Sequence, residues 1–175
     1  MTSRIVYRSR WITLREDQVI RPNGERGTYG FIQLRLTAGV LAIDSRNHIA
    51  LIEEFRYPLK TTTYELPRGL SVPGETPLQA AQREASEEAG IVGGRWQKLG
   101  VLNPGPGFTN EYLHLFLVRG FRVEETHPDD VEVQRVHWVP FPTLRKWIHK
   151  GKCNDAMTLA AIARYDTLAK KQRAG

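Results

Sequence analysis

One stretch of the chain, residues 69–91, constrains what the molecule can fold into more than any other. It reads GLSVPGETPLQAAQREASEEAGI. Thr76 can cap the N-terminus of a helix, Pro77 suits the first helical position, and Gln79 completes a capping box with Thr76. Gly90 suits the left-handed position at which a helix ends. The second half of the stretch therefore predicts a helix whose two ends are both specified by local signals.

This helix would carry an unusual concentration of negative charge on one side. At about 100° per residue, the side chains of Glu84, Glu87 and Glu88 fall within one arc of about 100°. Like charges three and four residues apart destabilise a helix by roughly 0.2–0.5 kcal/mol per pair, and Arg83 compensates for only part of this. Carboxylate oxygens are the ligands that Mg²⁺ and Mn²⁺ prefer, so we infer a divalent cation as the missing positive charge. A solvated acidic face is the alternative for a bare ExxEE pattern.

The wider spacing of the stretch favours the metal site over the solvated face. Residues 69–91 follow the pattern G-x5-E-x7-R-E-A-x-E-E-x-G-I. This pattern resembles the Nudix box, the signature of the Nudix hydrolases, and its many fixed positions make it far more specific than a short motif. Ala85 is a mild departure, because it is small where a larger aliphatic residue is common. The resemblance implies a Nudix fold, an α/β/α sandwich with mixed sheets, and an active hydrolase.

Composition narrows the class of protein that carries this motif. The chain has 175 residues, of which 41% are hydrophobic and 25% charged, as in an ordinary globular protein. No apolar run reaches the roughly 18 residues of a membrane span, and the N-terminus lacks the apolar segment of a signal peptide. Cys153 is the only cysteine, so a cytoplasmic location without membrane association is expected. The net charge of +6 comes from scattered basic residues, and nucleic acid is not expected as a partner.

The first 36 residues predict a small antiparallel β-sheet section that precedes the catalytic core. Residues 5–14 and 15–20 are rich in β-branched and aromatic side chains, and the Pro-Asn-Gly sequence at 22–24 is a strong turn signal within a hairpin over 19–33. A sheet of two or three strands is marginal by itself, so it must pack on the core or on another subunit.

Residues 37–175 predict the catalytic domain. Strands and helices mix there without a strict βαβ alternation, which is typical of an α+β domain with mixed sheets. A helix is expected at 143–150, and Asn154 is expected to cap a final helix. The expected strands lie at 37–44, 48–55, 62–66, 95–102, 111–119 and 131–139.

Segments outside the box are similar to one branch of the family, the ADP-ribose and ADP-sugar pyrophosphatases. EFRYP at 54–58 and ELPRG at 65–69 are close to sequences usual in that branch. Pro106 lies 16 residues after Gly90, a position associated with members that hydrolyse ADP-ribose, and residues 151–158 resemble the start of their C-terminal helix. The resemblance covers nearly the whole chain. It implies a homodimer in which the N-terminal section completes the partner's substrate site.

By this resemblance, the box supplies the metal site. Glu84 and Glu88 would be direct metal ligands, and Glu87 would be a further or water-mediated ligand; Glu87 and Glu88 are thus also candidate catalytic residues. The backbone carbonyl of Arg68 would be another ligand, and Gly69 would let the backbone approach the metal closely. The expected cofactor is Mg²⁺, with Mn²⁺ as an alternative, which neutralises the charge of a diphosphate and can activate water.

Five residues are candidates for contact with the substrate, and Pro106 is one of them. Arg56 is expected to clamp a diphosphate, because guanidinium pairs bidentately with phosphate, and a surface charge at a strand end is the alternative. The side chain of Arg68 could reach a phosphate or point to solvent. Glu65 could bind ribose hydroxyls or form a structural pair. Glu111, which follows the loop of Pro106, could lie near the substrate or form a buried ion pair.

Two further acidic positions have different expected roles. Glu75 is expected to orient its loop or the box arginine, and not to touch substrate. By the resemblance, the general base is expected in the acidic loop at 124–130. Glu125 is favoured over Asp129 there, and His127 could stand where relatives carry glutamate. A loop acid that is only solvated is the alternative.

The expected function is Mg²⁺-dependent hydrolysis of a nucleoside diphosphate sugar, with ADP-ribose as the first substrate and AMP and ribose 5-phosphate as products. GDP-mannose or another sugar nucleotide is the alternative within this class, because arginine clamps do not read the base. The alternative from another class is a catalytically silent module that keeps the fold and binds nucleotide or RNA for regulation. The intact set of Glu84, Glu87 and Glu88 argues against that module.

Overall fold

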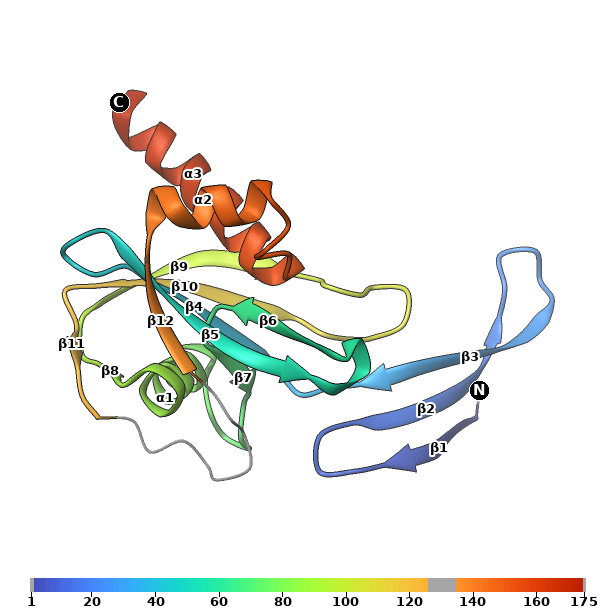
Figure 1. Ribbon diagram of the computed structural model, residues 1–175. Helices are drawn as coiled ribbons and strands as arrows, with labels where there is room; N and C mark the ends of the chain where they lie inside the picture. The colour runs from blue at the N-terminus through green and yellow to red at the C-terminus, as the bar shows by residue number, and fades with distance from the viewer. Residues whose placement is uncertain (1, 126–134, 175) are drawn as a thin grey trace.

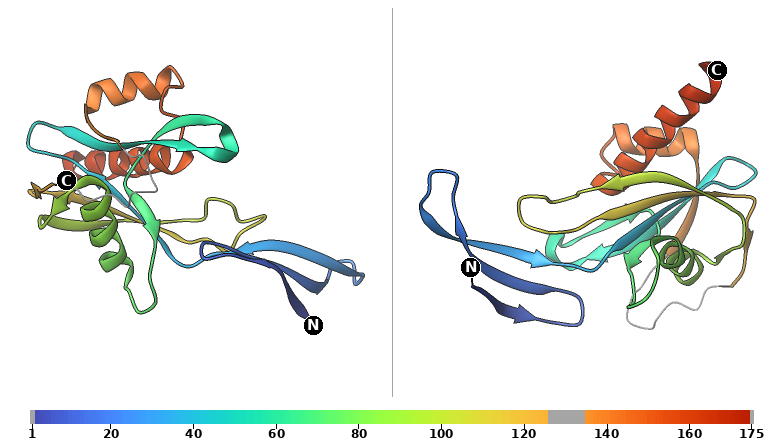
Figure 2. Two further views of the ribbon diagram at one scale, coloured as in Figure 1. Left: turned by 60° about the horizontal axis from the view of Figure 1, so that its bottom comes forward. Right: turned by 180° about the vertical axis from the view of Figure 1, so that it is seen from behind.

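The structure of the protein, a computed structural model, describes residues 2–125 and 135–174. A four-stranded and a three-stranded sheet lie between helices, and a separate three-stranded sheet extends to one side of this body (Figure 1, Figure 2). Within the described residues, no helix is both long and apolar enough to cross a membrane.

The sheet that extends from the body is the N-terminal antiparallel section. It consists of β1 (Ser3–Arg8), β2 (Thr13–Ile20) and β3 (Arg26–Gln33), in that spatial order. The hairpin between β2 and β3 turns at Gly24, whose φ of 85° requires glycine, as the sequence predicted. A turn divides the strand region expected at residues 5–14 between β1 and β2. The chain reverses at Ser9, and two hydrogen bonds close the turn. Ser9 N–H donates to Ile12 O at 2.9 Å, and Ser9 Oγ accepts from Ile12 N–H at 3.2 Å.

A mixed four-stranded sheet forms the centre of the body. Its strands lie in the order β7 (Arg68–Leu70), β4 (Thr37–Ala42), β10 (Leu113–Arg119) and β9 (Arg95–Leu102). β10 runs parallel to β4, whereas the β4–β7 and β10–β9 pairs are antiparallel.

A second sheet is antiparallel throughout and lies beside the first. Its order is β12 (Arg135–Pro140), β5 (His48–Arg56) and β6 (Thr61–Glu65), with the 3₁₀ turn η1 (Tyr57–Leu59) between β5 and β6. The short strands β8 (Ile91–Val92) and β11 (Arg122–Val123) pair separately. Residues 131–134 of the expected strand at 131–139 lie outside the described residues.

Within the described residues, three α-helices cover the sheets. Helix α1 (Pro77–Ala89) lies on one side, and α2 (Phe141–His149) and α3 (Ala156–Ala174) lie on the other (Figure 1). This mixture of sheets and helices confirms the expected α+β class.

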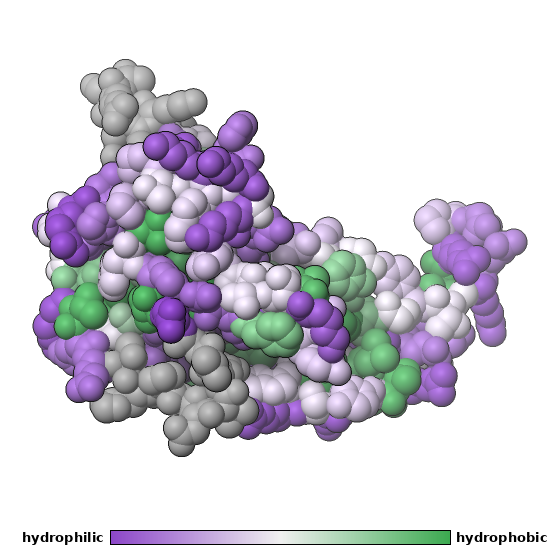
Figure 3. All heavy atoms as spheres, viewed as in Figure 1, coloured by the Kyte–Doolittle hydropathy of each residue, from purple (hydrophilic) through white to green (hydrophobic). Residues whose placement is uncertain are grey.

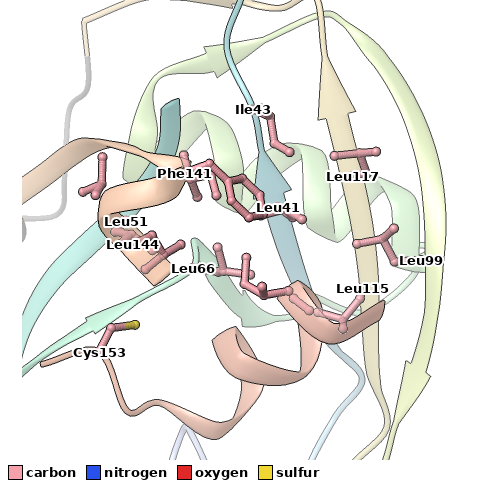
Figure 4. Packing of buried hydrophobic residues seen from close by; sticks show 14 of the residues in the cluster. Leu41, Ile43, Leu51, Leu66, Leu99, Leu115, Leu117, Phe141, Leu144 and Cys153 are labelled. Atoms are coloured by element: carbon pink, nitrogen blue, oxygen red, sulfur yellow. The ribbon is translucent and has the colours of Figure 1, made fainter. Parts of the chain in front are cut away.

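The central strands are buried on both faces, which explains their nearly continuous apolar sequences. Alternate residues of β4 serve two hydrophobic clusters, because side chains of a strand point to opposite faces. Leu41 packs towards α2 and α3 with Leu115, Phe141 and Leu144 (Figure 4). The neighbouring residues of β4, Ala38, Val40 and Ala42, pack towards the alanines of α1.

The ends of α1 form as their local signals predicted. Thr76 Oγ1 accepts from Gln79 N–H at 3.3 Å, and Gln79 Oε1 accepts from Thr76 N–H at 2.9 Å, which completes the capping box. Gly90 closes the helix with a φ of 65°. These contacts hold the acidic side of α1 in a defined position.

The start of α3 differs from the prediction by one residue. The carboxylate of Asp155, and not Asn154, accepts from Thr158 N–H at 2.8 Å and from Thr158 Oγ1 at 2.7 Å. The same hydroxyl accepts from Leu66 N–H at 3.0 Å, so the helix start is also joined to the segment between β6 and β7.

Candidate active site

Arg83 connects the acidic residues of α1 to the loop that precedes the helix. Its guanidinium donates to Glu84 at 2.8 Å and Glu87 at 2.9 Å, and its Nε donates to Glu75 at 2.8 Å. Glu75 also accepts from Val72 N–H at 2.8 Å. The expectation that Glu75 orients its loop or the box arginine is confirmed, because it does both.

The carboxylate of Glu84 is buried against the backbone of β7. Burial raises the pKa of Glu84 even though the charge of Arg83 opposes this shift. A Cβ atom at residue 69 would collide with this carboxylate, which explains why the position is glycine. The backbone of β7 therefore passes directly over one of the box glutamates.

A second box glutamate is hydrogen-bonded to the same strand. Glu88 Oε2 accepts from the backbone N–H of Arg68 at 2.8 Å. The third, Glu87, is the most open of the three, with a side chain 54% exposed. Glu84 and Glu88 are thus both in contact with the Arg68–Gly69 backbone, while Glu87 faces solvent beside Arg83.

The donor chemistry of this region suits a hard divalent cation. Carboxylate and carbonyl oxygens are the ligands that Mg²⁺ and Mn²⁺ prefer. Glu84, Glu87, Glu88 and the Arg68 backbone bring only such oxygens. In the described part of the chain, no three metal-binding side chains are gathered around one point, because Glu84 and Glu87 are instead hydrogen-bonded to Arg83. The oxygen ligands fit a divalent cation, and in this structure the guanidinium of Arg83 supplies the positive charge beside Glu84 and Glu87.

Glu65, at the end of β6, lies between two arginines. Arg56 donates to both of its carboxylate oxygens, from Nε at 2.9 Å and Nη2 at 2.7 Å, and Arg68 and Thr63 also donate to it. Burial opposes ionisation of this carboxyl, but the hydrogen bond from Arg56 and the charge of Arg68 outweigh burial and lower the pKa of Glu65 to about 2. Glu65 is therefore a carboxylate at neutral pH.

The expectation that the side chain of Arg68 points to solvent is wrong, because only 16% of the side chain is exposed. It pairs with Glu65 and, at 3.5 Å, with Asp155, and it contacts the sulfur of Met157. Arg68 thus ties β7 to the first turn of α3.

Arg56, Arg68 and Met157 line a pocket of about 270 Å³. It brings together four of the residues singled out from the sequence, Arg56, Arg68, Gly69 and Glu111, from three separate segments. Four residues that the sequence did not suggest complete the wall, namely Leu34, Thr37, Leu70 and Met157. Glu65 lies behind this wall as the partner of both arginines.

Comparison with known proteins identifies the family. A model of the NUDIX domain matches residues 33–157, and a model of the nucleoside diphosphate sugar hydrolase N-terminal domain matches residues 2–32. The chain belongs to the Nudix family. The expectation of a Nudix enzyme with this fold is therefore confirmed.

Individual Nudix relatives agree with the family match. The chain is 27% identical over 166 residues to an ADP-ribose pyrophosphatase of Mycobacterium tuberculosis, covering 93% of this chain and 80% of the relative. It is 30% identical over 159 residues to an ADP-ribose pyrophosphatase of Bacillus subtilis, covering 90% and 86%. A solved structure described as an ADP compounds hydrolase superposes with a TM-score of 0.85 at 22% identity, over 98% of this chain and 94% of that one.

Two of the residues expected in the Nudix site lie apart from the pocket wall. Pro106 is exposed in the loop between β9 and β10. Glu125 is exposed at the end of the first described segment, and Asp129 and His127 lie outside the described residues.

The loop of Pro106 is nevertheless fastened to the N-terminal section of the Nudix fold. Ile32 N–H donates to Phe108 O at 2.8 Å, and Leu34 N–H donates to Asn110 Oδ1 at 2.8 Å. Tyr29 Oη donates to Gly107 O at 2.7 Å. The loop therefore leads into Glu111 with its path set by β3 and the residues after it.

The missed pocket residues had no signal in the sequence. Leu34 and Met157 come from opposite ends of the Nudix domain, and only the fold brings them together. Thr37 opens an apolar strand, where a β-branched residue is ordinary. No motif or spacing marks any of them.

Proposed function

We propose that this Nudix enzyme hydrolyses the pyrophosphate bond of a nucleoside diphosphate sugar, with ADP-ribose as the substrate and AMP and ribose 5-phosphate as products. The observation that carries the proposal is that β7 lines the pocket and is also hydrogen-bonded to α1. Arg56 and Arg68 line the pocket, while the backbone of Arg68 is bonded to Glu88 of α1. Anion-binding groups and cation-binding groups therefore meet at one strand. Two relatives named as ADP-ribose pyrophosphatases support the choice of substrate.

In this proposal, Mg²⁺, with Mn²⁺ as an alternative, is held by Glu84, Glu87, Glu88 and the carbonyl of Arg68. When bound, the ion supplies positive charge for the diphosphate and lowers the pKa of a water nucleophile. The close approach of the Gly69 backbone to Glu84 supports this assignment.

Arg56 is proposed to clamp the diphosphate. Its side chain is one-third exposed, and its hydrogen bonds to Glu65 and Glu54 use three of the five N–H donors of a guanidinium. The remaining donors can reach a phosphoryl oxygen without breaking the pair with Glu65. Glu65 therefore holds Arg56 in one orientation, which reduces the entropy lost when the diphosphate binds.

The rest of the site is assigned to the sugar end and to proton transfer. Glu111 is proposed to accept hydrogen bonds from ribose hydroxyls, and Pro106 to shape the loop that leads to Glu111. Glu65 forms the structural pair that was its alternative role, because both of its oxygens accept from arginine and only 4% of its side chain is exposed. Glu125 remains the proposed general base, ahead of Asp129, because a carboxylate can accept a proton from the attacking water.

The protein is proposed to act as a cytoplasmic homodimer. Residues 1–36 would form the dimerisation section and residues 37–175 the catalytic domain. Large apolar side chains are exposed on the N-terminal sheet, namely Ile5, Val6, Tyr7, Trp11, Ile20 and Tyr29. Figure 3 shows hydrophobic residues on the side where this sheet meets the body. The surface of a second copy of this chain would cover these apolar side chains and remove them from water.

Release of phosphate from a panel of sugar nucleotides, coupled to a phosphatase, tests the proposed function. Wild-type protein should turn over ADP-ribose with Mg²⁺ and stop when a chelator is added. Glu88→Gln should lower kcat/KM at least about 100-fold, because even partners of metal ligands contribute 10- to 100-fold. Glu53→Gln on β5, where the carboxylate contacts His137 of β12, is the matched control and should keep full activity.

Three outcomes would overturn parts of this proposal. Faster turnover of GDP-mannose or another sugar nucleotide would replace ADP-ribose as the substrate. Turnover that is insensitive to chelator would remove the metal. Salt-sensitive binding of RNA without turnover of any panel member would favour the silent regulatory module.

A further inference from the structure

Thr37 is a polar residue at the start of β4, where every following residue of the strand is apolar or glycine. The residue is buried, with 6% of its surface exposed. Its backbone N–H is satisfied by Tyr112 O at 3.2 Å. Its hydroxyl is buried and has no hydrogen-bond partner among the described residues. A buried hydroxyl without a partner costs free energy, so folding alone does not explain its presence.

The other two buried threonines of the described chain make the contrast clear. Thr63 Oγ1 donates to the carboxylate of Glu65. Thr158 Oγ1 donates to Asp155 at 2.7 Å and accepts from Leu66 N–H at 3.0 Å. Both hydroxyls serve the arrangement around Arg56 and Arg68, whereas that of Thr37 lacks any such role.

Strand pairing places Thr37 on the pocket side of the sheet. Directly opposite residues of an antiparallel pair point to the same face. Thr37 is opposite Leu70, and Gly39 is opposite Arg68. Since alternate residues share a face, Thr37, Leu70 and Arg68 all point to one side. All three line the 270 Å³ pocket together with Arg56.

We propose that Thr37 is a substrate-contacting residue whose hydroxyl donates a hydrogen bond to an oxygen of the sugar-phosphate half of the nucleoside diphosphate sugar. The assignment rests on the proposed function and adds a recognition residue to the same site. Rotation about χ1 exchanges the positions of the hydroxyl and methyl groups, so the hydroxyl can turn to a bound ligand. The acceptor is a phosphoryl oxygen beside the two arginines or an oxygen of the sugar.

Two substitutions at this position test the proposal. Thr37→Val replaces the hydroxyl by a methyl group of similar size, and Thr37→Ser keeps the hydroxyl. Thr37→Val should raise KM for ADP-ribose about tenfold with little change in kcat, as expected for one lost hydrogen bond. Thr37→Ser should stay close to wild type. The midpoint of thermal unfolding of Thr37→Val should not fall, because no bond within the protein is lost.

Binding of two small ligands identifies the acceptor oxygen. Titration calorimetry with ribose 5-phosphate and with inorganic phosphate compares wild type with Thr37→Val. Weaker binding of both ligands points to a phosphoryl oxygen, and weaker binding of ribose 5-phosphate alone points to the sugar. Thr167→Val on α3, where the hydroxyl bonds to Ala163 O at 2.9 Å, is the control and should leave both affinities unchanged.

The results separate this inference from the proposed function. If wild type is active and Thr37→Val has an unchanged KM and unchanged affinities, the assignment of Thr37 fails alone. If Thr37→Ser is as impaired as Thr37→Val, the shape of the side chain matters and not its hydroxyl, which also overturns the assignment. If wild type hydrolyses no sugar nucleotide, the proposed function fails and the assignment fails with it.

Discussion

At the scale of single residues, Glu65 shows how one carboxylate organises a site. It accepts hydrogen bonds from Arg56, Arg68 and Thr63, and its side chain is 4% exposed. Two arginines that would otherwise repel each other can therefore line the same pocket. Glu54 and Asp155 complete the neutralisation of charge, at 2.8 Å from Arg56 and 3.5 Å from Arg68.

We expect Glu65→Gln to lower the free energy of unfolding by about 2 kcal/mol. This is less than the roughly 3–5 kcal/mol for breaking a fully buried pair, because Arg56 is partly exposed and both arginines keep another partner. Urea denaturation at pH 7 measures the change. Glu124→Gln, in the exposed pair with Arg122, is the control and should unfold as wild type does.

The same pair predicts a dependence of stability on pH. The pKa of Glu65 is about 2 in the folded state, against about 4.3 in an unfolded chain. Because the folded-state pKa is the lower one, the contribution is fully present above about pH 4.3 and is lost as the pH falls towards 2. The difference between wild type and Glu65→Gln should therefore shrink as the pH falls from about 4.3 to about 2. A difference that stays constant over this range would contradict the assignment of the ionised carboxylate.

At the scale of elements, the loop between β9 and β10 depends on the N-terminal section for its path. Asn110 Oδ1 accepts from Leu34 N–H at 2.8 Å, and Leu34 and Glu111 both line the pocket. Tyr29 reaches the same loop at Gly107. The N-terminal section therefore acts on the pocket of its own chain, in addition to any role in a dimer.

We expect Asn110→Ala to weaken substrate binding several-fold while destabilising the protein by about 1 kcal/mol, the typical net contribution of one hydrogen bond. Steady-state kinetics on ADP-ribose and urea denaturation measure the two effects. Asn23→Ala, in the distant turn between β2 and β3, removes a comparable side-chain bond to Glu25 and should leave KM unchanged. Identical KM values for the two variants would show that the hydrogen bond between Leu34 and Asn110 does not position the pocket.

Local interactions account for what the sequence could predict about these elements. The capping box of Thr76 and Gln79 spans four residues, and the Gly90 closure depends on one glycine, so both could be read directly. The turn at Ser9 was missed because the β-branched and aromatic residues on either side of it favour a strand.

The parts of the site that escaped prediction depend on contacts between distant segments. Arg68 was identified by its motif, but its side-chain partners Glu65 and Asp155 are decided by how β6 and α3 pack. Thr37 and Met157 carry no pattern of their own, and only the assembled fold makes them neighbours. A motif thus locates the metal-binding helix, whereas the pocket beside it is a property of tertiary structure.

At the scale of the whole molecule, the N-terminal sheet is the least self-sufficient part. All six residues of β1 are exposed, and a three-stranded sheet gains little stability without a surface to cover it. Its exposed apolar side chains include Tyr7 at 56% and Trp11 at 51%. A second cavity, of about 420 Å³, lies beside Trp11 and is lined by Arg8, Arg10 and Arg35 among others. Aromatic and guanidinium groups of this kind suit a nucleotide that reaches the sheet from another subunit.

We therefore expect the protein to be a homodimer of 40.0 kDa, twice the chain mass of 20.0 kDa, in light scattering coupled to gel filtration. Tyr7→Glu combined with Trp11→Glu should shift the mass to that of one chain, because burying two carboxylates at the interface is unfavourable. The double variant should also lose most of its turnover, since each pocket would then lack the sheet of its partner. Val123→Glu, at an equally exposed apolar position on β11, is the control and should remain dimeric and active.

Turnover and mass together decide what the sheet does. A monomeric double variant with full activity would mean that the dimer exists but that each pocket is complete within one chain. A wild-type protein that is monomeric and active would contradict the expected homodimer, because no second copy would then cover the exposed face of β1. Loss of mass and turnover in the double variant, with neither lost in Val123→Glu, is the one combination expected if the N-terminal sheet both joins the subunits and completes the site across them.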